Sequence, residues 1–274
     1  MTDTQRPASD RTRLIDSHCH LDDTRFDHDR DAVLVRARAA GVTTQIVPAI
    51  QRAWWPRLAA LCATHPGLHP AYGLHPMFTD CHHPDDLAEL ERWLRHEPAV
   101  ALGECGLDFY IEQPDKAVQR ALFEGQLEIA AAHRLPVIIH ARRSLEEVIA
   151  ALRRHPGLRG VLHSFSGSAE QARRLLDLGF SLGFGGPVTY PRATRLRRLV
   201  SELPLEAILI ESDAPDQPDI GHHGQRNEPA RLAILVDTLS RLRGEPPAVI
   251  AAATADNARR LFGLPREGGL TQER

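Results

Sequence analysis

The sequence predicts an α/β protein with a single domain, a (β/α)8 barrel of the TIM type. Eight short runs of aliphatic residues alternate with helical patterns along the 274 residues, and this length suits one barrel domain. The runs are almost continuously apolar, as expected of parallel strands that are covered on both faces. No glycine-rich dinucleotide fingerprint follows the first run, which disfavours an open doubly wound sheet.

Each aliphatic run predicts one strand, and most of the intervening segments predict a helix by their periodicity. The predicted strands are 14–20, 43–50, 68–75, 99–107, 136–141, 160–165, 180–185 and 207–213. The helices predicted from periodicity are 29–40, 52–64, 84–96, 191–202 and 228–243. Two further short helices, 245–252 and 254–262, are expected to pack outside the barrel or to close its lower end.

Local signals predict the remaining three helices. Pro114 suits the first turn of a long helix, because apolar residues recur at helical spacing over 118–129. Two other helices are predicted to begin with a capping box, in which a serine and a side chain three residues later satisfy free backbone N–H groups. These pairs are Ser144 with Glu147 and Ser168 with Gln171.

The composition is that of an ordinary globular protein, with the barrel predicted over 13–263. Residues 1–12 and 264–274 are expected to be flexible tails, because the first is polar and charged and the second is rich in Gly and Glu. We expect a cytoplasmic protein with no membrane segment and no obligate protein partner. The net charge is −3 and Lys116 is the only lysine, so a nucleic-acid substrate would be held locally and not along a basic track.

Six residues of metal-ligand type stand in or at the ends of the predicted strands. The first two are only two positions apart, where side chains of a strand share a face. In parallel barrels the carboxyl ends of the strands meet at one face, so that residues distant in sequence converge there. A lone buried histidine is more often a hydrogen-bonded core residue, but six ligands in this order favour a metal site. They are His18, His20, Glu104, His140, His163 and Asp213.

The order of these ligands around a closed barrel predicts two divalent cations. The ligands of the first and last strands would hold one cation, the two later histidines would hold the other, and Glu104 would bridge them. Two cations about 3.5–4 Å apart generate hydroxide from water at neutral pH, and Asp213 would take the remaining proton. The candidates are Zn²⁺, Mn²⁺, Co²⁺, Ni²⁺ and Mg²⁺, and four histidines favour the first four.

Further residues are candidates for substrate contact and for support of the ligands. His75 would contact a phosphate, protonate a leaving group, or only cap the turn that follows it. One of Arg142 and Arg143 is expected to bind phosphate through two parallel hydrogen bonds, with the other in solvent. Glu211 shares a face with Asp213 and is expected to orient a ligand without binding metal itself.

Seven motifs carry a resemblance to a known family. With them, the chain resembles the TatD family of metal-dependent deoxyribonucleases from Leu14 to Gly263. The resemblance implies a TIM barrel, two divalent metals on the six ligands, and hydrolysis of phosphodiester bonds, often from a DNA 3′ end. The motifs are Asp16-Ser17-His18-Cys19-His20, Gly73-Leu74-His75-Pro76, Gly103-Glu104-Cys105-Gly106-Leu107-Asp108, Pro136-Val137-Ile138-Ile139-His140, His163-Ser164-Phe165-Ser166-Gly167, Glu211-Ser212-Asp213-Ala214-Pro215 and Arg226-Asn227-Glu228-Pro229.

Three shorter segments refine this resemblance. Gly185-Gly186-Pro187 and Tyr190-Pro191-Arg192 are similar to the YjjV-like branch of the family. Family members commonly have a single arginine followed by an acidic residue after the histidine of the fifth strand. This chain has Ala141-Arg142-Arg143 at that point, which leaves its preferred substrate open.

Three functions are compatible with the sequence. The favoured hypothesis is a metal-dependent DNase that cleaves phosphodiester bonds at DNA ends. The alternative keeps the metals and changes the bond, as in an ester or amide hydrolase such as an aminoacyl-tRNA deacylase, because the fold does not determine the substrate. A non-catalytic protein with structural metals is the weakest hypothesis, since the predicted ligands are not the closed tetrahedral cysteine shell of such sites.

Overall fold

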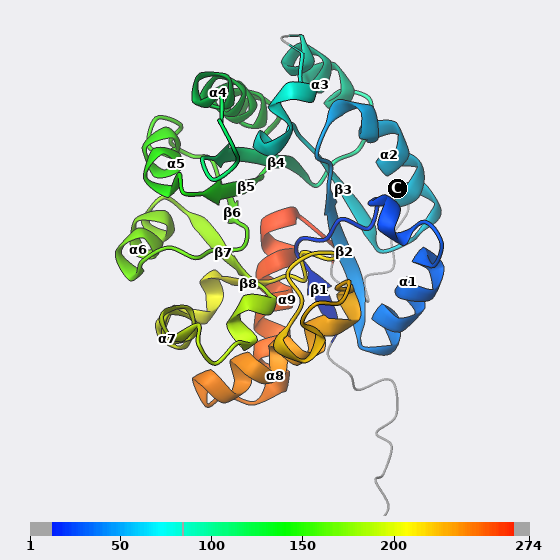
Figure 1. Cartoon of the computed structure of the whole chain (residues 1–274), viewed down its shortest axis with the longest axis vertical. Helices are drawn as coiled ribbons and strands as arrows, with labels where there is room; N and C mark the ends of the chain where they lie inside the picture. Colours follow the sequence, from blue (N-terminus) through cyan, green and yellow to red (C-terminus); the bar gives the residue numbers. More distant parts are fainter. Residues whose placement is uncertain (1–12, 84, 266–274) are drawn as a thin grey trace, which may run out of the picture.

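Eight parallel strands form one sheet in which the spatial order follows the chain from β1 to β8 (Figure 1). The computed structural model describes residues 13–83 and 85–265, so the predicted tail at 1–12 and most of the one at 264–274 lie outside the described residues. The predicted single-domain TIM barrel is confirmed. The strands are β1 (Leu14–Asp16), β2 (Val42–Pro48), β3 (Leu68–Tyr72), β4 (Ala101–Asp108), β5 (Val137–Arg142), β6 (Gly160–Leu162), β7 (Phe180–Phe184) and β8 (Ile208–Ile210).

Helices surround the sheet, and their positions agree with the sequence predictions to within a few residues except at the carboxyl-terminal end. Seven connecting helices and α8 lie on the outside of the barrel, whereas α9 crosses behind its centre (Figure 1). They are α1 (Arg30–Ala39), α2 (Trp55–Thr64), α3 (Asp86–Leu94), α4 (Lys116–His133), α5 (Leu145–Leu152), α6 (Ala169–Asp177), α7 (Thr194–Glu202), α8 (Leu232–Arg243) and α9 (Pro247–Phe262). None of the described helices is both long and apolar enough to cross a membrane.

The last helix differs from its prediction. Two short helices were expected over 245–252 and 254–262, but the structure has the single helix α9. Residues 251–253 are all alanine, the best helix former, so nothing interrupts the backbone hydrogen bonds there. The hydroxyl of Thr254 donates to the carbonyl oxygen of Ile250 at 2.9 Å and does not cap a new helix.

One of the two predicted capping boxes is present. The Ser168 side chain accepts from the backbone N–H of Gln171 at 3.1 Å, and the Gln171 side chain accepts from the backbone N–H of Ser168 at 2.8 Å. At the start of α5 the prediction is wrong. Ser144 occupies the cap position without a side-chain cap, because its hydroxyl donates instead to the carbonyl oxygen of Leu107 on β4 at 2.6 Å.

Hydrogen bonds just beyond the ends of β1 and β8 close the barrel. The backbone N–H of Ser17 donates to the carbonyl oxygen of Ile210 at 3.0 Å. The buried Asp16 carboxylate accepts from the backbone N–H of Ser212 at 2.9 Å and from its hydroxyl at 2.6 Å. The first and last strands of the sheet, β1 and β8, are therefore held together next to the residues that follow them.

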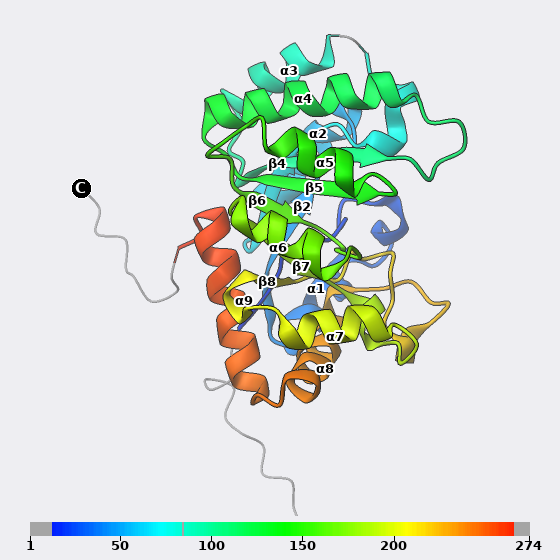
Figure 2. The ribbon, with the colours of Figure 1, turned by 90° about the vertical axis from the view of Figure 1, so that its left-hand side faces the viewer.

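The lower end of the barrel is filled with apolar side chains and covered by α9. Figure 2 shows α9 on the side away from the arrowhead of β5. Four residues of α9 form one apolar cluster with the inward-facing side chains of the strands: Ala255, Ala258, Leu261 and Phe262. The opposite, carboxyl end of the strands is left for the polar residues. The strand members of this cluster are Ile15, Ile46, Ala71, Ala101, Ile138, Val161 and Leu209.

Candidate metal centre

Glu104 lies at the centre of the six predicted ligands. It is inside β4 and only 1% exposed, so its carboxylate is removed from water. The side chains near one carboxylate oxygen come from a different part of the barrel than those near the other oxygen. We therefore describe the surrounding side chains as two groups. Oε2 has no hydrogen-bond partner, although imidazole nitrogens lie close to it.

The first group, here the seam group, consists of His18, His20 and Asp213, which follow β1 and β8. The Nε2 atoms of His18 and His20 are 3.2 Å apart and lie 3.1 and 3.5 Å from Glu104 Oε2. Asp213 Oδ1 is 3.5 Å from His18 Nε2 and 3.7 Å from His20 Nε2. The two histidines were expected on the first strand, but β1 ends at Asp16 and they lie in the segment after it.

The second group, here the strand group, consists of His140 and His163. His140 is inside β5, and His163 follows the last residue of β6. His140 Nδ1 and His163 Nε2 each lie 3.1 Å from Glu104 Oε1. The structure therefore brings all six predicted ligands together, with one oxygen of Glu104 toward each group.

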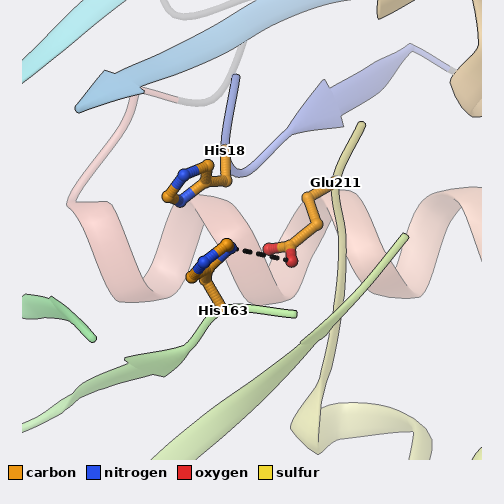
Figure 3. Close-up of side chains that lie close together, drawn as sticks. All are labelled: His18, His163 and Glu211. Carbon is orange, nitrogen blue, oxygen red and sulfur yellow. Dashed lines mark ion pairs between the residues drawn. The ribbon is translucent and has the colours of Figure 1, made fainter. Parts of the chain in front are cut away.

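Two of these histidines have a hydrogen-bond acceptor at the nitrogen that points away from Glu104, and His163 has a carboxylate near that nitrogen, whereas His18 Nδ1 has no hydrogen-bond partner among the described residues. His140 Nε2 is 2.9 Å from a carboxylate oxygen of Asp108, and His20 Nδ1 is 3.2 Å from the carbonyl oxygen of Pro48. His163 Nδ1 is 3.4 Å from Glu211 Oε1, an ion pair drawn in Figure 3. The His18 ring stacks on the His163 ring, with 4.0 Å between their centres. An acceptor at one nitrogen holds the hydrogen there and leaves a lone pair on the other, which is the tautomer a metal ligand needs.

Glu211 follows β8 and lies beside the ring of His163, and its role of orienting a ligand without binding metal stays a prediction. Its Oε1 atom accepts from the backbone N–H of Ser164 at 2.5 Å, beside the ring of His163. A side chain at Gly183 would collide with this carboxylate, because an added Cβ would lie 2.3 Å from Glu211 Oε2. The glycine on β7 thus makes the space in which Glu211 can reach His163.

His75 is arranged in the opposite way. Its Nδ1 accepts a hydrogen bond from the backbone N–H of Met77 at 3.1 Å, so this nitrogen carries the lone pair. The hydrogen of the neutral ring is then on Nε2, which lies 3.1 Å from Glu104 Oε1. The two readings of His75 from the sequence are compatible, since the ring caps the turn that follows and still presents an N–H to the site.

The electrostatics of the cluster depend on Glu104. Burial raises the pKa of its carboxyl group, but the surrounding histidines outweigh burial and hold the pKa well below its ordinary value. Burial lowers the pKa of His75 to about 4. Burial also lowers the pKa of His20, but Glu104 more than offsets it and raises that pKa to about 9. Glu104 therefore carries a buried negative charge, and a proton on the ring of His20 compensates it.

The residues present fit a metal centre. Among residues 13–83 and 85–265, three sets of potential ligand atoms occur, each with its atoms within 4.8 Å of one another. Two of the sets contain Glu104, and the third consists of His18, His163 and Glu211. The Oε2 atom of Glu104, which has no hydrogen-bond partner among the described residues, is a second sign, because a buried carboxylate oxygen without a donor is costly unless a cation neutralises it. Imidazole nitrogen with carboxylate oxygen is a donor set that suits divalent transition metals.

A cavity of about 660 Å³ opens above these residues. His20, His75, Glu104 and Asp213 form part of its wall, and Arg142 stands at its edge. Arg143 borders a smaller neighbouring cavity of about 380 Å³.

One of these two arginines was expected to bind phosphate, and Arg142 thus borders the cavity of the metal centre whereas Arg143 borders the neighbouring one. Both are exposed and both pack on the ring of Tyr110, with guanidinium carbons 3.7 and 4.3 Å from its centre for Arg142 and Arg143 respectively.

Two supporting residues were not assigned a role from the sequence. Asp108 lies four residues after Glu104 on β4, and the two-residue period of a strand could have placed both on one face. Gln217 donates to Asp213 Oδ2 at 2.5 Å and accepts from the Ser164 hydroxyl at 2.8 Å. Gln217 lies in the loop after β8, where the sequence carries no period that could have identified it.

Comparison with known proteins agrees with this geometry. A family model described as "TatD related DNase" matches residues 15–263. The uncharacterized metal-dependent hydrolase YjjV of Escherichia coli K12 is 42% identical over 256 residues, which cover 92% of this chain and 99% of YjjV. The crystal structure of YjjV, described as a TatD homolog, has a TM-score of 0.89 at 41% identity and covers 93% of this chain and 99% of that one.

The fold, the ligand cluster and these relatives define the class of protein, a metal-dependent hydrolase. The chain belongs to the TatD-related DNase family, and the resemblance to its YjjV-like branch is confirmed. A further relative, from Cronobacter sakazakii, is named 3′-5′ ssDNA/RNA exonuclease TatD. It is 33% identical over 258 residues, which cover 91% of this chain and 97% of the relative.

Proposed function

We propose that this chain is a phosphodiesterase that removes nucleotides from the ends of nucleic acids, in the manner of a 3′-end exonuclease. The observation that carries the proposal is the position of Glu104, whose two oxygens face two separate groups of ligand atoms. Such an arrangement suits a pair of cations, and paired cations are typical of nucleases. The exonuclease name of the Cronobacter sakazakii relative supports the choice of bond.

In this proposal the seam group would hold one divalent cation and the strand group the other, with Glu104 as a ligand common to both. Zn²⁺, Mn²⁺, Co²⁺ or Ni²⁺ suits the four imidazoles better than Mg²⁺, which prefers oxygen ligands. When bound, two cations would supply hydroxide at neutral pH and stabilise negative charge on the attacked phosphate.

Three side chains would act on the substrate and its protons. Asp213 lines the cavity with Oδ1 toward His18, while Gln217 holds its other oxygen, so it is oriented to accept a proton from the attacking water. His75 lines the same cavity, and its Nε2 hydrogen, which now faces Glu104 Oε1, would donate to a phosphate oxygen when cations occupy Glu104. Arg142 at the cavity edge would pair with the phosphate.

The test compares wild-type protein and the variant Glu104→Ala on end-labelled single-stranded DNA, after metal removal and addition of Zn²⁺, Mn²⁺ or Mg²⁺. Wild type should shorten the DNA from its end and lose this activity with a chelator. Glu104→Ala should be slower by about 10³-fold, a typical effect of removing one catalytic electrostatic group. Glu128→Ala, which removes an exposed glutamate on α4, is the matched control and should behave as wild type.

The same proteins are assayed on an aminoacyl-tRNA ester and on small esters and amides. Faster turnover of one of these than of DNA, by orders of magnitude in kcat/KM, would replace the nuclease assignment with the ester or amide hydrolase considered from the sequence. Equal DNA cleavage by wild type and Glu104→Ala would reject the proposed site. The cytoplasmic location and the absence of an obligate protein partner stay predictions.

A further inference from the structure

A groove lies beside the candidate metal centre, between the segment that follows β7 and the loop that follows β8. Its volume is about 1350 Å³. Figure 2 shows the loop between β8 and α8, in gold, projecting on the side toward which β5 points. The groove and the cavity of the metal centre share four wall residues, so the two spaces adjoin. They are Arg25, Pro187, Asp216 and Gln217.

The walls of this groove are tied together before any ligand binds. The hydroxyl of Tyr190 donates to the carbonyl oxygen of Pro218 at 3.1 Å, and the backbone N–H of Ile220 donates to the hydroxyl of Thr189 at 2.9 Å. At Gly186 an added Cβ would lie 2.1 Å from the carbonyl oxygen of Gln217, so the two segments are in backbone contact. A binding surface held in this way needs little ordering when it is occupied.

The lining combines a flat apolar surface with positive charge. The ring of Tyr190 stands with Pro187, Pro215 and Pro218 along the wall, and its hydroxyl end is fixed by the hydrogen bond to Pro218. Arg192 is exposed at the same wall, with its guanidinium carbon 5.9 Å from the centre of the tyrosine ring.

The other charges of the groove are largely compensated. Arg25 forms ion pairs with Asp216, which also lines the groove, and with Asp23. Arg226 pairs with Asp29. No carboxylate among residues 13–83 and 85–265 pairs with Arg192, so its charge is available to an anion.

We propose that this groove binds the part of a single-stranded nucleic acid next to the bond being cut, with a base stacked on Tyr190 and a phosphate paired with Arg192. The inference rests on the proposed function. An aromatic ring beside an unpaired cation is the combination that binds single strands without sequence preference. Because the groove adjoins the cavity of Glu104, a strand bound there would have its end beside the metal centre.

The test measures kcat/KM for a single-stranded oligodeoxynucleotide and for bis(p-nitrophenyl) phosphate, which has no nucleotide chain, with the metal-loaded full-length protein. Tyr190→Ala should lower kcat/KM for the oligonucleotide by about 5- to 100-fold, the effect of losing one stacked base. Arg192→Ala should reduce the dependence of binding on salt, by about 0.7 in the slope of log K against log salt. Neither change should affect the small diester.

Two control variants separate binding from folding. Tyr190→Phe keeps the ring without the hydroxyl and should stay within about twofold of wild type if stacking is the function of this residue. Arg173→Ala removes an exposed arginine on α6, outside the groove, and should leave the salt slope unchanged.

The outcomes distinguish the groove from the active site. Cleavage of the oligonucleotide by wild type with equal kcat/KM and salt slope in Tyr190→Ala and Arg192→Ala would overturn the groove proposal and leave the nuclease assignment intact, with another occupant for the groove. Loss of activity on both substrates would indicate a damaged metal centre and would also overturn the groove proposal. Failure of wild type to cleave either diester would reject the proposed function itself.

Discussion

The two ends of the barrel are equally buried but are built from opposite kinds of side chain. At the lower end Ile15 is 2% exposed and packs with Phe262 of α9 in an apolar cluster. At the upper end His18 is 0% exposed and Glu104 is 1% exposed, and charged or polar groups surround both. Buried apolar groups stabilise the fold, whereas buried charges cost free energy unless they are compensated. The lower end therefore provides stability, and the upper end uses part of it to hold a reactive site.

The largest expected effect is on activity, from a change at the upper end. Asp213→Asn keeps the shape of the side chain and removes its capacity to accept a proton. Diester hydrolysis should fall by about 10²- to 10⁴-fold, the usual contribution of a general base, while the melting temperature stays the same or rises. Steady-state kinetics and thermal unfolding of the same preparations give both values.

The matched control for this change is Asp237→Asn, at an exposed position on α8. It should alter neither activity nor stability, as is usual for surface substitutions. If Asp213→Asn instead lowered the melting temperature strongly and left the catalytic rate of the folded fraction unchanged, the upper end would serve stability and not activity. That result would contradict the comparison of the two ends.

The next effect is on stability, from a change at the lower end. Phe262→Ala opens a cavity below the strands and should reduce the free energy of unfolding by about 3–5 kcal/mol. The catalytic rate of the folded fraction should be unchanged, because Phe262 packs in the apolar cluster of the lower end, which includes none of the six candidate ligands. Denaturant unfolding and kinetics at low temperature measure the two quantities.

Val249→Ala on the same helix serves as the comparison, because Val249 is 45% exposed. Its effect on stability should be within about 0.5 kcal/mol of zero. A drop in the catalytic rate of folded Phe262→Ala as large as that of Asp213→Asn would show that the two ends are not independent.

The smallest of the three effects is on metal affinity, from a residue that contacts no substrate. Asp108→Asn removes the charge that faces His140 Nε2, and it should weaken metal binding by about 10- to 100-fold. Competition with a fluorescent chelator measures the affinity, and excess metal should restore most of the activity. Unchanged affinity would mean that Asp108 does not orient the ligand.

The fold could be predicted from the sequence in most of its elements, because each strand depends on a local run of apolar residues. The length of β1 could not be predicted from the sequence. The residues after Asp16 bond across to the segment that follows β8, and the register with β2 shifts between Leu14 and Ile15, so the strand ends before His18. The single helix α9 was also missed, since its continuity depends on contacts with the barrel's lower end as well as on its alanines.

The six ligand positions could be predicted for a different reason. Each is a residue of metal-binding type in or next to a strand, and the closed barrel brings those positions together whatever the loops do. The supporting residues are less predictable. The role of Gln217 follows from a loop conformation, and that of His75 follows from which nitrogen accepts the N–H of Met77. The sequence did not indicate Gln217 at all, and for His75 it left the choice among three roles open.

The most direct test of the central claim is an anomalous-scattering map from a crystal soaked in Zn²⁺ or Mn²⁺. The account predicts two peaks, one between Glu104 Oε2 and the seam group and one between Glu104 Oε1 and the strand group. A map with no peak there, or with a single peak on one side of Glu104 at saturating metal, would contradict it.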